Sequence, residues 1–254
     1  MVYDSLTDIP RNLKEGIDWL IALRGTHAGN NFKAMGAAVY NFLADKPVGF
    51  TEVPALEEVK VITKEFLEQE ELKDLWPANA MLTRFDRPVD KNPPALAKFF
   101  KSVNRNQYTN VVKDGGITSK TIADTLAKSV FGFEKFLKGI KDPGQYKSAY
   151  SSEATWDASC AKNPEDCAAV FVGIAPMLYA GLYSLIDASY KDWMDWLKCN
   201  KRNINLGNLL KAVGYVVPER RDELSDSDVR TALSGVSSHI LETLYDLSGF
   251  WAFY

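Results

Sequence analysis

Three cysteines and two histidines are the residues whose types could carry covalent or metal chemistry: Cys160, Cys167, Cys199, His27 and His239. A thiol and an imidazole can act together as nucleophile and base, but only within hydrogen-bonding distance of each other. No H-E-x-x-H, C-x-x-C or G-x-S-x-G motif and no glycine-rich nucleotide-binding loop occurs in the chain. We therefore expect that the protein is not an enzyme and that it holds no cofactor and no metal.

Six residues, AKNPED, separate Cys160 from Cys167. One interpretation is a local disulfide that closes a turn just before a helix begins. The other is that all three cysteines are buried free thiols in a reducing compartment. The bend expected at Asn163-Pro164 favours the Cys160–Cys167 disulfide, which leaves Cys199 either buried or free for a partner.

The strongest charge asymmetry lies between residues 84 and 120. This stretch holds eight lysines and arginines and three aspartates, a net charge of +5 in a chain whose total is −3. It reads either as a solvated loop or as an interaction surface for an acidic partner. Arginine and aromatic side chains dominate binding energy at interfaces, so the predicted partner-binding residues are Arg84, Phe85, Arg87, Arg105 and Tyr108. The negative total charge argues against a nucleic-acid partner.

The other charged groupings predict ordinary helix surface. Glu57, Glu58, Glu68, Glu70 and Glu71 fall on or beside a segment with apolar residues at helical spacing. Carboxylates on the polar face of such a helix are typically solvated. We expect no acid–base chemistry from them.

The element that must position everything else is the segment from Cys167 to Ile186, twenty residues without Asp, Glu, Lys or Arg. A helix that is apolar on all sides lies inside a large protein or crosses a membrane. Pro176, several hydroxyl groups and the absence of flanking Lys/Arg clusters favour a buried central helix. Its small residues predict a seam against which other helices pack: Gly173, Ala180, Gly181 and Ser184.

Apolar residues recur at three to four positions along most of the remaining chain, and no alternating strand pattern stands out. A first helix is expected from Thr7 or Asp8 to Gly25, a long one from Thr118 or Ser119 to about Lys141, and a last one from Ser225-Asp226 to Leu247. The expected fold is all-α: a single compact bundle of about seven to nine helices around the central apolar helix. Residues 1–254 form one domain, and residues 76–116 are a long, loop-rich basic insertion.

The two ends of the chain add expectations about its setting. The N-terminus lacks the basic region and apolar run of a secretory signal. Four of the last six residues, Gly249–Tyr254, are aromatic. Such an ending is unusual for a free tail, and we expect that it packs onto the bundle or leads toward an anchor in a longer protein.

Two strings carry a resemblance to a known family. They are Tyr3–Thr7 with Pro10–Leu20, and the cysteine pair Cys160…Cys167 followed by Phe171–Leu182. Both resemble framework segments of the variant erythrocyte surface antigens of babesial parasites. The resemblance covers the N-terminal twenty residues and the central helix; the remainder is similar only in style.

The resemblance implies an ectodomain-like part of a polymorphic antigen on the surface of the infected host erythrocyte. It implies antigenic variation, immune evasion and cytoadhesion through a host cell-surface protein, an immune inhibitory or an endothelial receptor. Contact with a membrane would come only through an anchor missing from this chain. The chain departs from larger members in having three cysteines and no long cysteine- and lysine-rich segment. The competing interpretation is an intracellular helical scaffold or regulatory protein with reduced cysteines.

Overall fold

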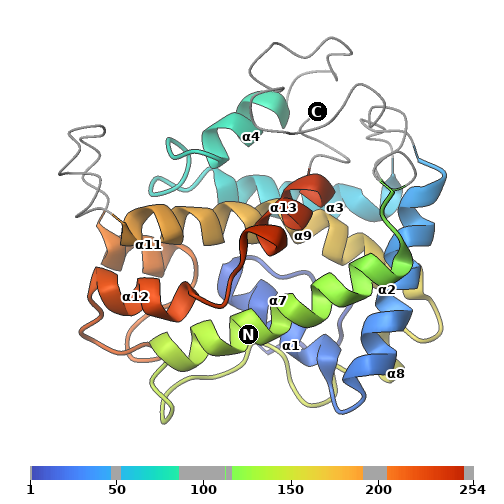
Figure 1. Cartoon of the computed structure of the whole chain (residues 1–254), viewed down its shortest axis with the longest axis horizontal. Coiled ribbons are helices and arrows are strands. Elements are labelled where there is room, and N and C mark those ends of the chain that lie inside the picture. Colours follow the sequence, from blue (N-terminus) through green and yellow to red (C-terminus); the bar gives the residue numbers. More distant parts are fainter. Residues whose placement is uncertain (1, 47–52, 86–111, 113–115, 191–204, 249–254) are drawn as a thin grey trace.

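The computed structural model describes residues 2–46, 53–85, 112, 116–190 and 205–248. Within these residues the fold is all-α, as the sequence predicts, with ten helices and no strand (Figure 1). The helices are α1 (Leu13–Arg24), α2 (Ala28–Ala44), α3 (Pro54–Leu67), α4 (Ala78–Phe85), α7 (Ser119–Ile140), α8 (Trp156–Ser159), α9 (Pro164–Ser189), α11 (Leu206–Ala212), α12 (Asp226–Leu233) and α13 (Ser238–Ser248).

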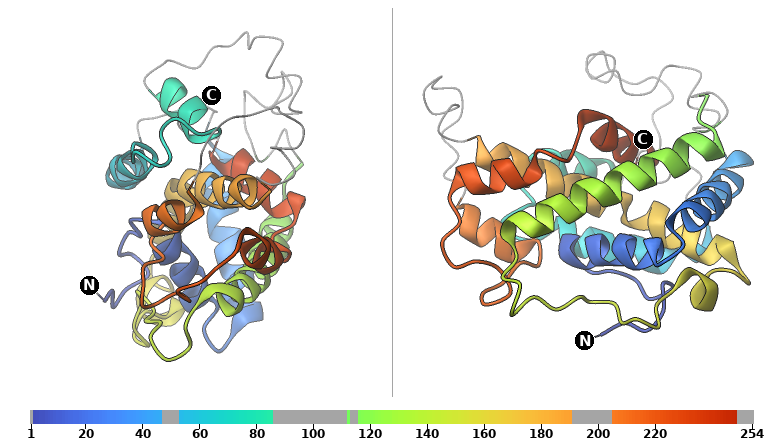
Figure 2. Two further views of the ribbon diagram at one scale, coloured as in Figure 1. Left: turned by 90° about the vertical axis from the view of Figure 1, so that its left-hand side faces the viewer. Right: turned by 60° about the horizontal axis from the view of Figure 1, so that its bottom comes forward.

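Helix α9 is the centre of the bundle. Every residue from Cys167 to Leu182 is buried, and the helix packs against α1, α2, α3, α11, α12 and α13 (Figures 1 and 2). Among the described residues, α9 is the one helix whose length and composition would suit a membrane span, yet most of it is buried inside the bundle. The position of α9 therefore agrees with the predicted central core helix.

The small residues of α9 let its neighbours approach closely. A Cβ added to Gly173 would lie 2.3 Å from Cγ1 of Val59 on α3, and one added to Gly181 would lie 3.1 Å from Leu13 on α1. A glycine of α1 allows the same close approach to α9, because a Cβ on Gly16 would lie 2.8 Å from Cδ2 of Leu178. The packed seam is where the periodicity and the small residues predict it.

The first helix starts later than predicted. Thr7 and Asp8 do not cap it; Ser5 to Asp8 form a turn in which the Asp8 amide donates to the Ser5 carbonyl at 3.2 Å. Helix α1 begins at Leu13, and Asn12 caps it by accepting from the amide of Glu15. The turn brings Leu6 under α1, where its carbonyl accepts from Nε1 of Trp19 at 2.8 Å. The contact between Leu6 and Trp19 thus fixes a turn in a segment that local propensity predicted to be helical.

The predicted last helix is two helices, α12 and α13. The expected start is confirmed, because Ser225 and Asp228 form a reciprocal capping box. The break falls at Gly235, whose carbonyl oxygen lies against the backbone of Gly132 on α7: a Cβ on Gly132 would be 2.5 Å from that oxygen. This close approach of two backbones ends α12, and α13 then turns onto α9.

Candidate functional site

The predicted partner-binding residues lie only partly within the described structure. Arg84 and Phe85 are the last two residues of α4, and their side chains are outside the description. Arg87, Arg105 and Tyr108 lie outside the described residues altogether. The structure therefore shows the start of the basic insertion, which is helical, and leaves its predicted contact residues as a prediction.

The start of the insertion is fixed to the bundle by aromatic packing. The ring of Trp76 meets the ring of Tyr183 edge-on, with their centroids 4.3 Å apart, and lies 6.2 Å from that of Tyr179. Both tyrosines belong to α9. Helix α4, which follows directly, packs on α3. The first residue of the insertion is thus packed against the central helix, and loops that carry recognition are typically positioned by such a scaffold.

A second surface lies along α7. At helical spacing, one stripe of this helix faces outward, and every residue of it is exposed: Lys120, Asp124, Lys128, Phe131, Lys135 and Lys138. Phe131 is 71% exposed, more than any other large apolar side chain in the described structure. The lysines of this outward stripe have no carboxylate within 4 Å among the described residues, so their charges remain available to a partner.

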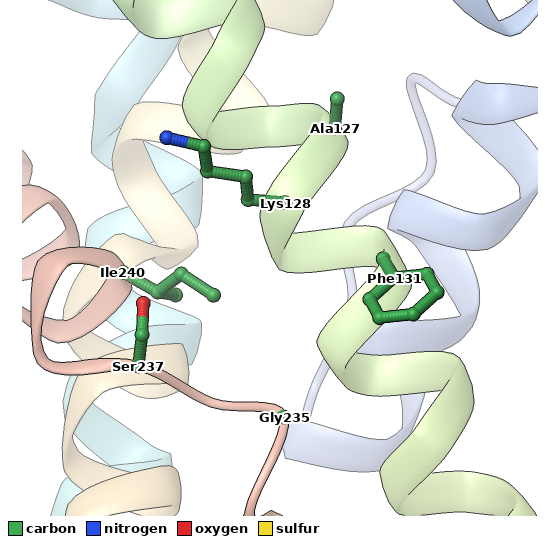
Figure 3. A pocket seen from close by; sticks show the side chains of 6 residues that line it. All are labelled: Ala127, Lys128, Phe131, Gly235, Ser237 and Ile240. Atoms are coloured by element: carbon green, nitrogen blue, oxygen red, sulfur yellow. The ribbon is translucent and has the colours of Figure 1, made fainter.

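A shallow pocket of about 400 Å³ adjoins this stripe (Figure 3). Ala127, Lys128 and Phe131 of α7 form one side, and Gly235, Ser237 and Ile240 from the α12–α13 turn and α13 form the other. Ile240 is buried and Phe131 stands at the rim. The arrangement has the shape to accept one apolar side chain and has no group that would do covalent chemistry on it.

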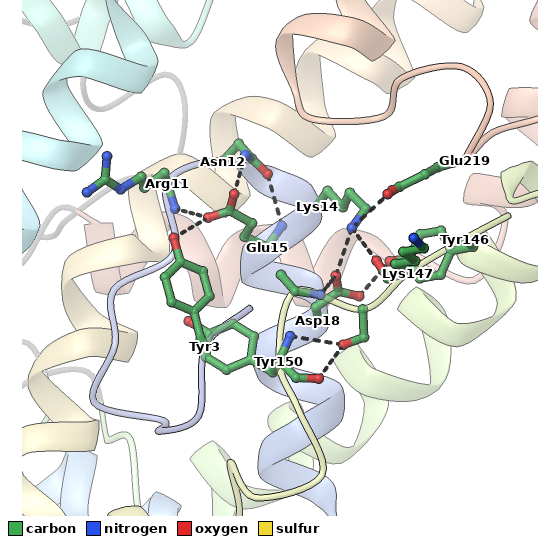
Figure 4. A network of polar contacts seen from close by, with 12 residues as sticks. Tyr3, Arg11, Asn12, Lys14, Glu15, Asp18, Tyr146, Lys147, Tyr150 and Glu219 are labelled. Atoms are coloured by element: carbon green, nitrogen blue, oxygen red, sulfur yellow. Dashed lines mark hydrogen bonds and ion pairs between the residues drawn. The ribbon is translucent and has the colours of Figure 1, made fainter. Parts of the chain in front are cut away.

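A buried polar network joins α1 to the segment after α7 (Figure 4). Nζ of Lys14 lies 3.2 Å from Oδ2 of Asp18 and 3.3 Å from Oε2 of Glu219. The Tyr146 hydroxyl donates to Oδ1 of Asp18 at 2.5 Å, and the amide of Ala149 donates to Oδ2 at 2.9 Å. Three chain segments therefore meet at one ion pair: α1, the segment after α7 and the stretch that carries Glu219.

The electrostatics of this network favour a structural role. Burial raises the pKa of Asp18 above its usual value, although Lys14 and the hydrogen bond from Tyr146 lower it. Burial also raises the pKa of Tyr146 far above that of a free tyrosine. The ion pair carries a desolvation cost, and the hydrogen bonds from Tyr146 and Ala149 give the Asp18 carboxylate partners inside the fold. The side chains of Lys14 and Asp18 are 9% and 2% exposed, so a substrate has no access to them.

The structure contains the Cys160–Cys167 disulfide that the sequence favoured. Cys160 and Cys167 are bonded to each other, with their Cα atoms 5.8 Å apart, and both are buried. Cys199 lies outside the described residues. His27 precedes α2 and His239 lies on α13, and both are exposed. Within the described part of the chain, no group of three or more His, Cys, Asp or Glu residues is placed to hold a metal.

Sequence reasoning missed Lys14, Asp18 and the α7 surface. Lys14 and Asp18 are spaced like an ordinary surface pair on a helix, and nothing local reveals that Tyr146 and Ala149 cover them. Phe131 did leave a signal: it falls off the apolar stripe formed by Val130, Phe133 and the other inward residues of α7. A large apolar residue off the stripe is the pattern that would have pointed to this surface.

Comparisons with protein-family models, with curated proteins and with solved structures give no match to this chain.

Proposed function

We propose that this chain is the receptor-binding, ectodomain-like part of a variant surface antigen displayed on infected erythrocytes. The observation that carries the proposal is that the two strings resembling babesial surface antigens pack on each other. Trp19 of the first string stacks on Phe171 of the second, with the ring planes 4° apart and the centroids 6.1 Å apart. Gly16 faces Leu178 and Leu13 faces Gly181 across the same seam. The two strings therefore form one packed structural unit. A family of variable antigens would need to retain such a unit while its surface residues change.

The Cys160–Cys167 disulfide supports an extracellular setting. Disulfides form and persist in oxidising compartments and are rare in the cytosol. The bridge joins Cys160, the residue after α8, to the first turn of α9, so it fixes the start of the central helix. A chain-entropy treatment of so short a loop gives about 2–3 kcal/mol of stabilisation.

Binding is then left to surfaces outside the framework. The residues of the two strings that form the seam are buried, so they are not available to a receptor. The insertion that begins at Trp76 has an excess of positive charge. The Trp76 ring packs against Tyr183 of the central helix. The partner that this charge favours is an acidic host cell-surface protein, an immune inhibitory or an endothelial receptor. A screen of the purified domain against a library of such receptors tests the proposal.

Reversing Arg84, Arg87 and Arg105 to Glu should slow association with the receptor by at least tenfold at physiological salt. Basic residues around a contact steer an acidic partner and act mainly on the association rate. The control reverses Lys33, Lys162 and Lys211 to Glu, three exposed residues elsewhere on the domain, with the same change in net charge. Surface plasmon resonance measures both, after circular dichroism has shown unchanged helicity. Equal slowing by the two triple variants would remove the insertion as the contact surface.

The alternative function is an intracellular helical scaffold or regulator. It requires all three thiols to be reduced in the cell. Counting free thiols by mass spectrometry, after alkylation of the denatured but unreduced protein, separates the two: an antigen should show Cys160 joined to Cys167, and an intracellular regulator should show three alkylated cysteines.

A further inference from the structure

We propose that the outward face of α7 is a docking site for an acidic segment of a partner protein that carries one apolar side chain. The site consists of the pocket beside Phe131 and the exposed lysines on the same face. None of these residues belongs to the basic insertion, and the proposal does not depend on where the protein is displayed.

The pocket sets the apolar part of the partner. Its volume of about 400 Å³ lies at the lower end of the range for small-ligand pockets, about 300–1,000 Å³, so it has room for a leucine or phenylalanine side chain. The rim ring of Phe131 and the buried side chain of Ile240 supply the apolar surface, and Ser237 supplies a hydroxyl at the edge (Figure 3). Burial of an anchor against these groups would also cover Phe131, which is otherwise exposed to water.

The floor of the pocket is held in place before any partner binds. The Gly235 carbonyl lies against the backbone of Gly132 on α7. The amide of Val236, the next residue, donates to the carbonyl of Leu233 at 2.8 Å. The two sides of the pocket are therefore joined at its base, and a preorganised site loses less free energy in ordering when it binds.

The charge sets the rest of the partner. Lys120, Lys128, Lys135 and Lys138 share the face with Phe131, and Asp124 is the one acidic residue in the outward stripe. Glu134, at the edge of this face, already pairs with Arg24 of α1. The net positive charge along about five turns of helix matches an extended acidic segment, which would lie along α7 with its apolar anchor in the pocket.

A protein segment fits this face better than a membrane does. A helix that binds a lipid surface presents several large apolar side chains on one face, next to its lysines. The outward stripe of α7 presents one, Phe131, beside a hollow. Burying a single anchor in a hollow is the pattern of peptide recognition.

The test uses the whole chain and a fluorescein-labelled ten-residue peptide with a single central phenylalanine between runs of glutamate. Fluorescence anisotropy should give saturable binding with a Kd below about 1 mM. Phe131→Ala should weaken it at least tenfold and Lys128→Glu about threefold. The matched controls are Val61→Ala, a residue that is 57% exposed on α3, and Lys162→Glu, an exposed lysine next to the disulfide; both should leave the Kd unchanged.

Three results would overturn the proposal. The first is the absence of saturable binding to the wild-type chain, and the second is equal weakening by the control variants. The third is binding to phosphatidylserine vesicles that Phe131→Ala abolishes while the peptide fails to compete, which would assign the face to a membrane instead. Because Phe131 is exposed, Phe131→Ala should leave the unfolding midpoint within error, so loss of binding cannot be ascribed to misfolding. A failure of the receptor screen described above would not affect these outcomes.

Discussion

Asp18→Ala should lower the free energy of unfolding by about 3 kcal/mol, at the lower end of the range for breaking a buried ion pair. The change removes the acceptor for three groups at once: Lys14, the Tyr146 hydroxyl and the Ala149 amide. The part-buried hydroxyl and the buried amide would lose this acceptor, at about 1–3 kcal/mol for each group left unsatisfied in the interior, before relaxation. Glu219 still faces Lys14, which is why we do not expect a larger loss. Urea unfolding followed by circular dichroism measures it.

The control for Asp18 is Glu70→Ala. Glu70 also pairs with a lysine, Lys73, at 2.6 Å, but the two side chains are 80% and 38% exposed. Surface pairs of this kind contribute about 0–1 kcal/mol, so the midpoint should barely move. If Asp18→Ala and Glu70→Ala cost the same, the network around Asp18 is not the tie between α1 and the segment after α7 that we describe.

Gly36→Ala should lower the free energy of unfolding by about 2–3 kcal/mol. Gly36 lies on α2 where this helix meets α7, and an added Cβ would be 2.4 Å from the Ser119 carbonyl oxygen and 2.9 Å from the Ala123 amide nitrogen. Both are backbone atoms of α7, so no side chain can rotate away and the helices must separate. Overpacking of this kind costs about 1–3 kcal/mol, and the rigidity of the backbone places Gly36→Ala near the top of that range.

Gly29→Ala is the matched control for Gly36→Ala because it makes the same change in the same helix. A Cβ at Gly29 would meet nothing within 4 Å, and alanine is favoured over glycine in a helix by up to about 1 kcal/mol. The two variants should therefore shift the thermal midpoint in opposite directions. A stabilising or neutral Gly36→Ala would mean that α2 and α7 do not approach through this glycine.

The sequence was sufficient where the physical cause was local. Helix α7 starts after Thr118, as predicted, because the threonine side chain accepts from the amide of Thr121 and the apolar stripe begins directly afterwards. The central helix follows from its uniform apolar composition, and the disulfide from the short spacing of Cys160 and Cys167. In each case the evidence lies within a few turns of the chain.

The sequence was insufficient where distant segments decide. The turn from Ser5 to Asp8 replaces a predicted helical turn because Leu6 is held by Trp19 and by Ser159, whose hydroxyl accepts from the Leu6 amide at 2.9 Å. The last helix breaks at Gly235 because Gly132, over one hundred residues away, lets its backbone come close. The partners of Leu6 and of Gly235 cannot be inferred from periodicity. Periodicity indicates which side of a helix is buried but not which segment covers it.

The proposed α7 docking face also depends on a contact between distant segments that the sequence does not reveal. Phe131 was recognisable as an apolar residue off the buried stripe, yet the pocket beside it exists only because the α12–α13 turn lies across α7. The predicted contact residues in the insertion came from charge and residue type alone. The charge of a segment can suggest the kind of partner. The shape of the binding surface can be inferred only from the folded structure.

We propose that this framework stands on the outside of an infected erythrocyte and binds a host protein there. The most direct measurement is labelling of infected cells by an antibody raised against the folded domain, before and after permeabilisation. We expect labelling of intact cells, and its loss when the intact cells are first treated with trypsin. Labelling that appears only after permeabilisation would contradict the claim and favour the intracellular alternative.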